Sequence, residues 1–449
     1  FMDELDEELW KLGINAKTEH NEAAPAQHEL APIYATTNMA VDQNLLIMEY
    51  MRLIAERHDL VCLLHEKPYA GVNGSGKHNN WSLSTDGGKN LVDPGKTPRE
   101  NTRFLLFLAA IVRAVDEYQD LLRMSVAYPG NDHRLGGFEA PPAIISMFLG
   151  EEMEDIVNSI VEERVYEDHK AATMNLGIPS VPTFRKDTTD RNRTSPIAFT
   201  GNKFEFRMLG SSQSIAGPNI ALNTIMAEEL GRFADTLEAA EDFDTALQQI
   251  ICDAFTAHQR IIFNGDGYSE EWKAEAQRRG LSNLRCTPES LPTYISEKNI
   301  ALVSRHGVFT ENEFRARHEI HLETYKKTVG IEGRTMVDMV LHQILPAALR
   351  YSSDLAGSVA RKQKLNLAAE AERGLASRIS ECCDWLYEKV EQLHEALKAV
   401  PKSNSAALQY HYEVTIPLME AVRKDADLLE KLTAKSYWPY PTYSDILYY

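Results

Sequence analysis

Residues 71–80 constrain the fold of this chain, because they begin like a phosphate-binding loop and do not continue like one. Their sequence, GVNGSGKHNN, matches G-x-x-x-x-G-K up to Lys77, but His78 stands where a P-loop needs Ser or Thr. A P-loop also needs a helix that starts at this point, so that its amide groups face the phosphates. Instead, the following residues alternate between polar and apolar, which is typical of a half-buried strand. We therefore predict a strand on which His78, Asn80 and Ser82 share one face.

The length and charge of the chain exclude some classes of function. Its 449 residues predict two or three domains, or one large catalytic domain with appendages. The net charge of −19 argues against nucleic acid and anionic membranes as partners. It does not exclude ATP, since a few local positive groups and a metal are enough to hold a nucleotide. No stretch approaches the roughly 20 apolar residues of a membrane helix.

The cysteines predict a reducing compartment. They are odd in number and form no C-x-x-C pair. The five are Cys62, Cys252, Cys286, Cys382 and Cys383. We interpret them as small buried hydrophobic residues and expect the protein in the cytoplasm.

Hydrophobic spacing predicts helices and strands in the first half of the chain. Helices are expected over residues 2–13, 38–58 and 101–123, the last capped by Asn101, and from about residue 142. Residues 196–209 read as one strand, with Lys203, Glu205 and Arg207 on one face and apolar residues on the other. One face of that strand is therefore expected to be packed and the other to be charged.

From residue 217 the pattern is helical. Residues 379–400 place apolar residues at alternating spacings of four and three, and Pro401 follows as a stop. Residues 404–433 read as a return helix with a kink at Pro417. We predict an antiparallel helical hairpin, which packs either on its own body or on a neighbouring subunit, and an aromatic tail that docks on a surface that the sequence does not specify.

Acidic residues and one histidine in strand or loop settings suggest a metal site. Glu22 and Glu29 are seven residues apart, but Pro25 breaks the stretch into two arms, so both carboxylates can reach one ion. His78 and Glu205 lie on predicted strands. Carboxylates with a single imidazole suit Mg²⁺ or Mn²⁺ better than Zn²⁺. The alternative for each acid is an ordinary solvated surface position.

Arginines near these acids suggest phosphoryl transfer. They are Arg134, Arg191, Arg193 and Arg207. A divalent metal and guanidinium groups can neutralise phosphate oxygens while carboxylates hold the metal. The alternative is a surface network of ion pairs.

Five segments together resemble the motifs of glutamine synthetases. KPYAGVNGSGKHNNWS, residues 67–82, resembles that family's ATP-region signature at every fixed position. NEAAPAQHE resembles its E-x-x-x-G-Q-x-E segment, with Ala26 in place of glycine, and HRLGGFEAP resembles its R-L-x-x-G-x-E-A-P loop but is one residue shorter. RNRTSP and KFEFR resemble its phosphate-binding arginine segment and its final E-x-R strand. The motifs stand in the family's order, and the chain is most similar to the type III, large-subunit bacterial form.

The resemblance implies a role for each matching position. The metal ligands would be Glu22 and Glu29 for one divalent ion, Mg²⁺ or Mn²⁺, and His78 and Glu205 for the other. The substrate-binding residues would be Asn73, Gly74 and Arg134, with Arg134 on the α-carboxylate of glutamate. Ser82 and Lys203 would face ATP, Arg193 and Arg207 would neutralise the transferred phosphoryl group, and Glu139 would lie on a flap and help to deprotonate ammonium. Lys77 would then be incidental.

The implied reaction has two steps. ATP phosphorylates the γ-carboxylate of glutamate, and ammonia attacks the acyl phosphate to give glutamine. Water must be excluded or the intermediate hydrolyses, which is a physical reason for a flap hinged at Gly136 and Gly137.

The chain departs from the family pattern in two respects. Ala198 stands where the short bacterial form has a second phosphate-binding arginine, so another residue must complete the phosphate pocket. The family's upstream E-x-E strand, and the small N-terminal β-domain that supplies an acid for ammonium to the adjacent subunit, have no counterpart in this sequence. We therefore expect this polypeptide alone to be inactive or severely impaired, and activity of a chain of this length would contradict that expectation.

Two other functions stay open at this stage. One is a related ligase that joins glutamate, or another carboxylate, to an amine other than ammonia. The other is a non-catalytic nitrogen-sensing or assembly protein on the same scaffold. The resemblance also implies a homo-oligomer of stacked hexameric rings, a dodecamer, with active sites between neighbouring subunits.

The fold class that we expect is α+β. A curved, mostly antiparallel sheet would carry the ligand face and be wrapped by helices, and a largely helical C-terminal region would follow. The expected domains are a catalytic domain over 1–240, a helical insertion or extension over 241–330, and a helical hairpin region with an aromatic tail over 331–449.

Overall fold

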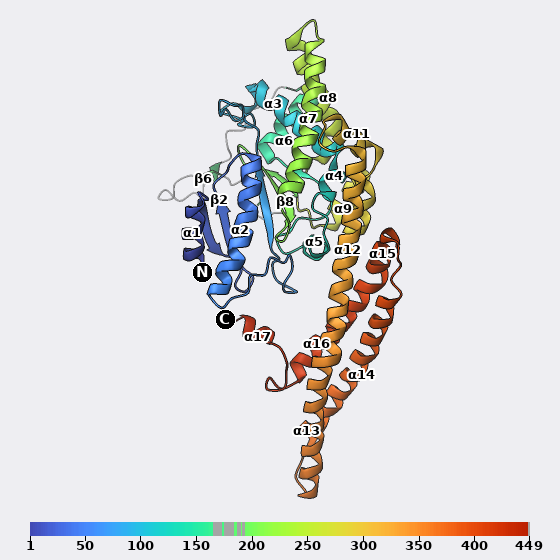
Figure 1. Cartoon of the computed structure of the whole chain (residues 1–449). Helices are drawn as coiled ribbons and strands as arrows, with labels where there is room; N and C mark the ends of the chain where they lie inside the picture. The colour runs from blue at the N-terminus through green and yellow to red at the C-terminus, as the bar shows by residue number, and fades with distance from the viewer. Residues whose placement is uncertain (165–172, 175–183, 186–189, 191–193, 448–449) are drawn as a thin grey trace. The chain divides into compact units, whose positions relative to one another are not determined.

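The computed structural model describes residues 1–164, 173–174, 184–185, 190 and 194–447. The chain forms two compact units, residues 1–315 and residues 316–449. The first unit holds all the strands and the second is helical (Figure 1). The finer division of the chain at residues 240 and 330 stays a prediction.

The N-terminal part of the first unit is a helix, a β-hairpin and a long helix. These are α1 (Met2–Lys11), β1 (Ala16–Asn21), β2 (His28–Pro32) and α2 (Thr37–Arg57). Both predicted helices are confirmed. Leu5 and Leu9 of α1 are fully buried and pack with Ile47 and Ile54 of α2. The hairpin is antiparallel and pairs His20 with Glu29 across the two strands.

The central sheet has four strands in the order β3-β8-β7-β4. They are β3 (Gly76–Trp81), β8 (Phe204–Gly210), β7 (Ile197–Phe199) and β4 (Met147–Phe148). The pairs β3–β8 and β7–β8 are antiparallel, and β4–β7 is parallel. A further short antiparallel pair is formed by β5 (Thr173–Met174) and β6 (Phe184–Arg185). The α+β class with a mostly antiparallel sheet is therefore confirmed.

The single strand predicted over residues 196–209 is wrong, because the segment is a hairpin. The chain turns between β7 and β8, where the amide of Thr200 donates to the carbonyl of Lys203 at 2.9 Å. Gly201 has a φ of 92° in this turn, a backbone conformation that favours glycine. The packed face is confirmed in β8, where Phe204, Phe206 and Met208 are buried, but burial does not alternate along the strand, because Arg207 and Leu209 are buried as well.

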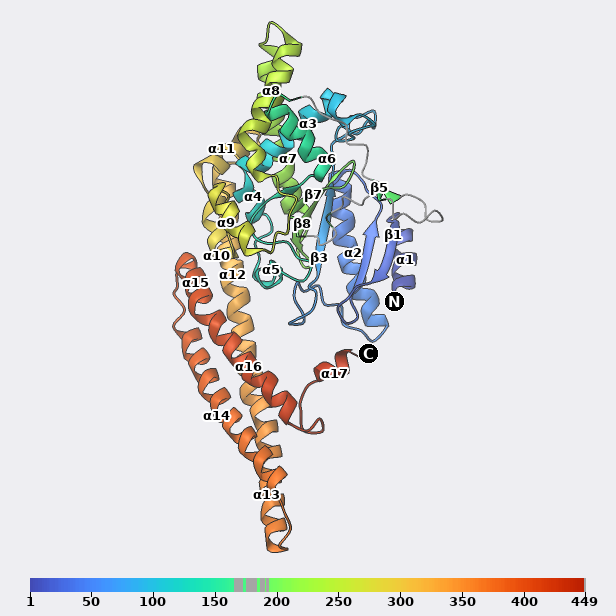
Figure 2. The same cartoon turned by 180° about the vertical axis from the view of Figure 1, so that it is seen from behind.

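Helices cover the apolar face of this sheet (Figure 1; Figure 2 gives the view from behind). Phe204 and Phe206 of β8 line a small cavity together with side chains of α3 (Thr102–Glu117) and α7 (Ala216–Glu238). The other helices of this unit are α4 (Gln119–Met124), α5 (Pro129–Arg134), α6 (Glu151–Val161), α8 (Phe243–His258), α9 (Glu270–Arg278), α10 (Thr287–Tyr294) and α11 (Glu297–Arg305). One core of this unit therefore lies between β8 and the helices α3 and α7, in addition to the cluster of α1 and α2.

Two expectations for helices in this region need correction. The helix predicted over residues 101–123 is interrupted at Tyr118, between α3 and α4, although the side chain of Asn101 does cap it by accepting from the amide of Phe104. The helix expected from about residue 142 does not start there, because the chain first enters β4 and α6 begins at Glu151. Parallel pairing of β4 with β7 outweighs the local helical pattern.

The second unit contains the predicted helical hairpin. Its helices are α12 (Glu311–Met339), which begins in the first unit, α13 (Leu345–Lys364), α14 (Glu370–Lys398), α15 (Asn404–Tyr410), α16 (Ile416–Leu432) and α17 (Tyr443–Leu447). Ile379, Leu386 and Val390 of α14 are fully buried in one cluster with Val422 and Leu429 of α16. The hairpin is confirmed, and it packs within its own unit.

Two π-helical segments interrupt the helices of this unit. They are Val340–Ile344 and His411–Thr415, and each is followed after one residue by a proline, Pro346 or Pro417. A proline inside a helix lacks the amide hydrogen and its ring clashes with the carbonyl four residues earlier. A wider turn relieves that clash. The helix predicted over residues 404–433 is thus interrupted by a π-helical turn just before Pro417, and the kink predicted at Pro417 stays a prediction.

The aromatic tail packs on the same unit. Trp438 and Tyr440 contact its hydrophobic cluster, and the rings of Tyr437 and Tyr351 lie 5.0 Å apart between centroids.

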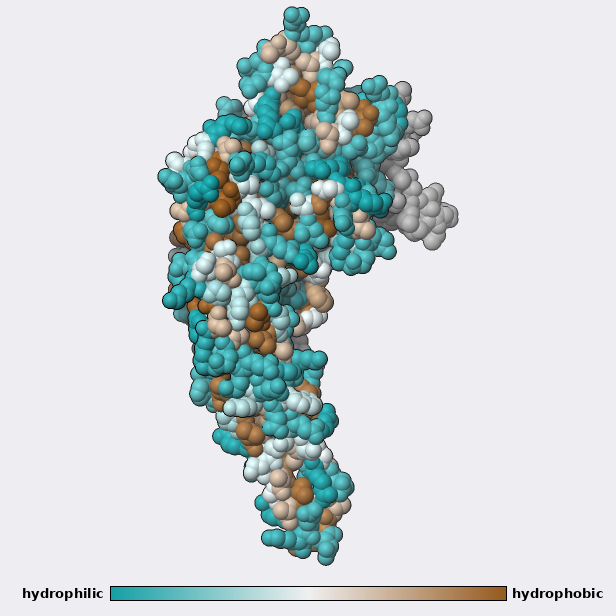
Figure 3. All heavy atoms as spheres, turned by 90° about the vertical axis from the view of Figure 1, so that its right-hand side faces the viewer, coloured by the Kyte–Doolittle hydropathy of each residue, from teal (hydrophilic) through white to brown (hydrophobic). Residues whose placement is uncertain are grey.

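On the face shown in Figure 3, hydrophobic residues lie scattered among hydrophilic ones over the helices of this unit. Scattered exposed apolar residues are ordinary on a protein surface.

Two further expectations concern the burial of the cysteines and the lack of a membrane-spanning helix. All five cysteines are free, and Cys286, Cys382 and Cys383 are buried whereas the other two are half-buried. Among the residues that the structure describes, no helix combines the length and the apolar character needed to span a bilayer.

Candidate functional site

The β1–β2 hairpin brings together three side chains that can bind a metal ion. His20 lies opposite Glu29, and Glu22 follows two residues after His20, so all three point to the same face. The Nε2 atom of His20 lies 2.7 Å from Oε1 of Glu22 and 3.4 Å from Oε2 of Glu29. One ligand atom from each residue lies within 4.8 Å of the others. The two predicted ligands are therefore brought together, with a histidine that the sequence reasoning did not consider.

The turn of this hairpin contacts the loop that carries the predicted glutamate-binding residues. Ala26, which replaces the family's glycine, has a φ of 50°. The side-chain amide of the next residue, Gln27, donates to the carbonyl of Gly74 at 3.2 Å. Asn73 and Gly74 are half-buried in that loop.

A second cluster lies where β3 pairs with β8. The pairing register shifts between Lys77, which pairs with Leu209, and Asn79, which pairs with Phe206, so two residues of β8 lie opposite the single residue His78. The Nδ1 atom of His78 lies 3.9 Å from Oε2 of Glu205. The same Oε2 atom accepts a hydrogen bond from Nε of Arg207 at 3.2 Å. The structure thus brings together the predicted ligands His78 and Glu205 with the predicted phosphate-binding Arg207.

Arg207 is buried and paired with a second acid. Its Nη1 atom lies 2.8 Å from Oδ2 of Asp190, which also accepts from the amide of Ser195 at 3.0 Å. Both side chains of the pair are less than a tenth exposed. Asp190 therefore fixes Arg207 beside Glu205.

Arg134 is also buried, at the end of α5 beneath β8. Its guanidinium donates to Oδ1 of Asn131 at 3.3 Å and to the carbonyls of Met208 and Arg207 at 3.2 and 3.1 Å. Burial lowers the pKa of Arg134 to about 10, and the negative charge of Glu66 opposes that shift. A Cβ atom on Gly76 would lie 2.1 Å from the guanidinium, so only glycine fits there.

The predicted flap is a tight exposed loop with unusual backbone angles. Gly136 has a φ of 95°, and Phe138 and Glu139 have φ values of 52° and 66°. Positive φ in two residues that are not glycine stores backbone strain of the kind found at functional loops. The hydroxyl of Tyr268 donates to the carbonyl of Ala140 at 2.8 Å and holds the base of the loop. Burial, with the charge of Glu139, raises the pKa of that hydroxyl to about 12.

The remaining predicted residues lie as follows. Ser82 is exposed just after the end of β3, and Lys203 is half-buried in the turn just before β8. Ala198 is fully buried in β7. Arg193, together with Arg191, lies outside the described residues, so its predicted role stays a prediction.

Two charged residues near these side chains, Glu66 and Asp190, had no predicted role, and a third, Lys77, was predicted to be incidental. Glu66 and Asp190 are both buried, and the amine of Lys77 is packed against the sulfur of Met48 at 3.1 Å and the carbonyl of Gln213. Desolvation lowers the pKa of Lys77 to about 8. Glu66 could have been found from its position directly before the KP of the 67–82 motif. Asp190 could have been found from its position beside the arginines of RNRTSP.

This geometry defines a class of site before any comparison is made. Two groups of carboxylates with a histidine, next to buried guanidinium groups and a strained acidic loop, suit divalent cations and an anionic substrate.

Comparison with known proteins then identifies the family. Residues 1–141 match the model of the glutamine synthetase catalytic domain, and residues 246–363 match the model of the glutamine synthetase C-terminal domain. Together the two models cover more than half of the chain, which therefore belongs to the glutamine synthetase family.

Individual relatives agree with this family. The chain is 45% identical to a type-3 glutamine synthetase of Dictyostelium discoideum over 99% of this chain and 62% of that protein. It is 43% identical to a glutamine synthetase of Butyrivibrio fibrisolvens over 100% of this chain and 65% of that protein. It is also similar to the solved structure "GmaS/ADP complex-Conformation 1", with a TM-score of 0.47 and 15% identity over 73% of this chain and 60% of that one. The chain thus spans somewhat less than two thirds of the length of the curated relatives.

Proposed function

We propose that the protein is an ATP-dependent ligase that forms L-glutamine from L-glutamate and ammonia through γ-glutamyl phosphate, and so assimilates nitrogen. The observation that carries the proposal is the meeting of His78, Glu205 and Arg207 at the β3–β8 pair, beside buried Arg134. Family membership and relatives named glutamine synthetase support the same reaction. A sensing or assembly protein would have little need for both the ligand clusters and the acidic flap.

The residues present fit two divalent cations, Mg²⁺ or Mn²⁺. His78 and Glu205 would hold one, and Glu22 and Glu29 the other, with His20 within reach of the second. Oxygen-rich donor sets with one imidazole suit these ions. When bound, divalent cations neutralise phosphate oxygens and orient the transferred group.

The arginines act on the anionic groups of the substrates. Arg134 binds the α-carboxylate of glutamate, with Asn73 and Gly74 beside it. Arg207, and Arg193 with it, neutralises the transferred phosphoryl group while Ser82 and Lys203 face ATP. The γ-carboxylate oxygen bonds to the terminal phosphorus of ATP as the bond to ADP breaks. Preorganised positive charge of this kind lowers the barrier because it needs no rearrangement during the reaction.

The flap serves the second step. Ammonium gives up a proton to Glu139, and the ammonia so formed attacks the acyl carbon while phosphate leaves. The exposed position of Glu139 and the positive φ of Gly136 suit a loop that closes when substrates are bound. Closure keeps water from hydrolysing the acyl phosphate.

The assembly and location of the protein are part of the same proposal. Stacked hexameric rings, with active sites between neighbouring subunits, and a cytoplasmic location are what the family resemblance implies. Size-exclusion chromatography with light scattering tests the assembly, and a particle of fewer than twelve subunits would contradict the dodecamer.

The experiment that tests the activity is phosphate release from ATP and glutamate with Mg²⁺, measured with and without ammonium, on this chain and on the full-length gene product. Ammonium-dependent release with formation of glutamine supports the proposal. Release that depends on another amine, and not on ammonium, would replace it with a glutamate–amine ligase. Binding of ATP and metal without release under any condition would favour a sensing protein.

A further inference from the structure

Glu66 is a buried acid that the proposed mechanism does not use. Its side chain is only 1% exposed, although it immediately precedes the loop of residues 67–75. Its Oε1 atom accepts two hydrogen bonds from Ser212, from the amide at 3.0 Å and from the hydroxyl at 2.5 Å. The carboxylate therefore ties the start of this loop to the segment between β8 and α7.

The same residue closes the loop that carries Asn73 and Gly74. The amide of Ser75 donates to the backbone carbonyl of Glu66 at 2.8 Å, so residues 66 and 75 form the neck of the loop. A Cβ atom on Gly74 would lie 2.5 Å from that carbonyl oxygen and 3.1 Å from Cγ of Arg134. The loop neck and the arginine are therefore in close contact.

Glycines surround the Glu66 carboxylate. A Cβ atom on Gly130 would lie 2.3 Å from its Oε2 atom, and one on Gly210 would lie 2.5 Å from its Oε1 atom. Gly130 belongs to α5, which also carries Arg134, and Gly210 ends β8. The Glu66 carboxylate thus lies directly against Gly130 and Gly210, and a side chain at either position would have to displace it.

The negative charge of Glu66 balances the positive charge of Arg134, whose hydrogen-bond partners among the described residues are all neutral. The guanidinium of Arg134 donates to one side-chain amide oxygen and two backbone carbonyls. Burial lowers the pKa of Arg134, and Glu66 raises it. The same carboxylate also raises the pKa of Lys77 against a larger effect of burial. Charge interactions are strong at such sites because little water screens them.

We propose that Glu66 is a positioning residue for glutamate, because it fixes the Asn73–Gly74 loop and holds Arg134 in place without contacting the substrate itself. The inference rests on the proposed function, since Arg134 is taken to bind the α-carboxylate. On this inference, Glu66 contributes to the affinity for glutamate and not to the rate of the chemical step.

The test is binding of L-glutamate by isothermal titration calorimetry, together with steady-state kinetics, on the full-length gene product and its Glu66→Gln variant. The substitution keeps the shape and removes the charge. We expect glutamate affinity to fall about 10- to 100-fold, KM for glutamate to rise to match, and kcat and KM for ATP to change less than about threefold. Glu66→Asp should restore part of the affinity, and the exposed Glu152→Gln on α6 is the matched control.

A double variant separates positioning from a general loss of structure. If Glu66 acts through Arg134, then Glu66→Gln combined with Arg134→Gln should bind glutamate no more weakly than Arg134→Gln alone. Additive losses would overturn the action of Glu66 through Arg134, and a fall in kcat with unchanged KM would overturn the inference as a whole. If Glu66→Gln does not fold, Ser212→Ala removes one of the two hydrogen bonds and should shift affinity in the same direction, and unchanged affinity there would overturn it.

The two proposals fail in different ways. If the unsubstituted protein does not bind glutamate, the proposed function is wrong and this inference falls with it. If the unsubstituted protein binds glutamate and Glu66→Gln binds equally well, only the inference about Glu66 is wrong.

Discussion

At the scale of single residues, burial divides the charged side chains of the site into two groups. Arg134, Arg207 and Asp190 are almost fully buried, whereas His20 and Glu29 are about half exposed. Buried charges are held by fixed partners, and removal of one partner leaves an uncompensated charge. Exposed ligands can exchange water for a metal ion with little loss. The two groups should therefore respond differently to substitution.

Substitution of His20 tests the exposed group. If His20 is a third ligand beside Glu22 and Glu29, His20→Asn should weaken Mn²⁺ binding at this site by about 10- to 100-fold. The affinity can be measured by electron paramagnetic resonance of free Mn²⁺. His28→Asn, on the neighbouring strand and outside the metal-binding group, is the control, and equal effects of the two substitutions would argue against a ligand role.

Substitution of Asp190 tests the buried group. Asp190→Asn removes the charge that lies 2.8 Å from Nη1 of Arg207. We expect the free energy of unfolding to fall by about 3 kcal/mol, because a buried guanidinium loses one of its two acidic partners. Urea unfolding followed by circular dichroism measures the change. Asp253→Asn, at an exposed position of α8, should change it by less than about 0.5 kcal/mol.

At the scale of helices and strands, glycines show where close packing and intrinsic preference compete. Gly333 of α12 is buried, and a Cβ atom there would lie 2.9 Å from Cδ2 of Leu397. Gly374 of α14 is exposed, and a Cβ atom there would meet nothing within 4 Å. Helix propensity favours alanine at both positions, but packing opposes it at only one.

The two glycines give a matched pair of stability predictions. Gly374→Ala should raise the free energy of unfolding by about 0.5–1 kcal/mol, because alanine loses less backbone entropy than glycine. Gly333→Ala should lower it by about 1–3 kcal/mol, because the added methyl group overlaps Leu397. Chemical unfolding of both variants measures these changes in the free energy of unfolding. Stabilisation by Gly333→Ala would show that α12 and α14 can move apart at little cost.

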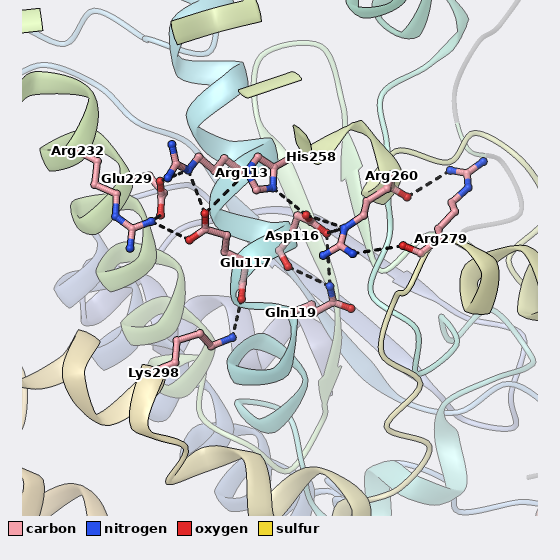
Figure 4. A network of polar contacts seen from close by, with 10 residues as sticks. All are labelled: Arg113, Asp116, Glu117, Gln119, Glu229, Arg232, His258, Arg260, Arg279 and Lys298. Carbon is pink, nitrogen blue, oxygen red and sulfur yellow. Dashed lines mark hydrogen bonds and ion pairs between the residues drawn. The ribbon is translucent and has the colours of Figure 1, made fainter. Parts of the chain in front are cut away.

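At the scale of the whole molecule, an ion-pair network joins the two regions that match the glutamine synthetase models (Figure 4). Asp116 of α3 lies 2.8 Å from Nδ1 of His258 and 2.9 Å from Nε of Arg260. Glu229 of α7, which lies between the two regions in the sequence, lies 2.8 Å from Nε of Arg113 and 2.9 Å from Nη1 of Arg232. The network is local to the first unit and links α3, α7 and α8.

Glu229 makes the stability of this unit depend on pH. Burial, and then the charge of Glu117, raises the pKa of Glu229 to about 7 in the folded protein, compared with 4.5 for an ordinary Glu. The folded state therefore holds the proton more tightly than the unfolded chain. The stability gained in this way is fully present below about pH 4.5 and is lost as pH rises towards 7.

The pH dependence can be measured by comparing Glu229→Gln with the unsubstituted protein. The difference in Tm between the two should change between pH 5 and pH 7.5, with the unsubstituted protein losing stability relative to the variant as pH rises. Differential scanning fluorimetry across this range, with Glu152→Gln as control, is sufficient. Parallel curves for the variant and the unsubstituted protein would show that the proton bound by Glu229 does not affect folding.

Local signals in the sequence predicted much of the fold. The helices α1 and α2, the cap at Asn101, the hairpin of α14 and α16 and the packed apolar face of β8 all follow from spacing and side-chain type, and each is confirmed. The boundaries failed where distant pairing decides. The hairpin of β7 and β8 was read as one strand, and β4 was read as helix, because strand pairs are stabilised by partners far away in the sequence.

For the site, the sequence by itself determined which residue types are present and in what order, and the motif resemblance grouped Glu22 with Glu29 and His78 with Glu205. Only the tertiary structure decided what surrounds them. It placed His20 between the two carboxylates and Asp190 against Arg207, and it enclosed Glu66 among glycines. Most of these contacts depend on burial and on strand register, which arise when distant segments pack together, so a local pattern could point to the residues but not to all of their partners.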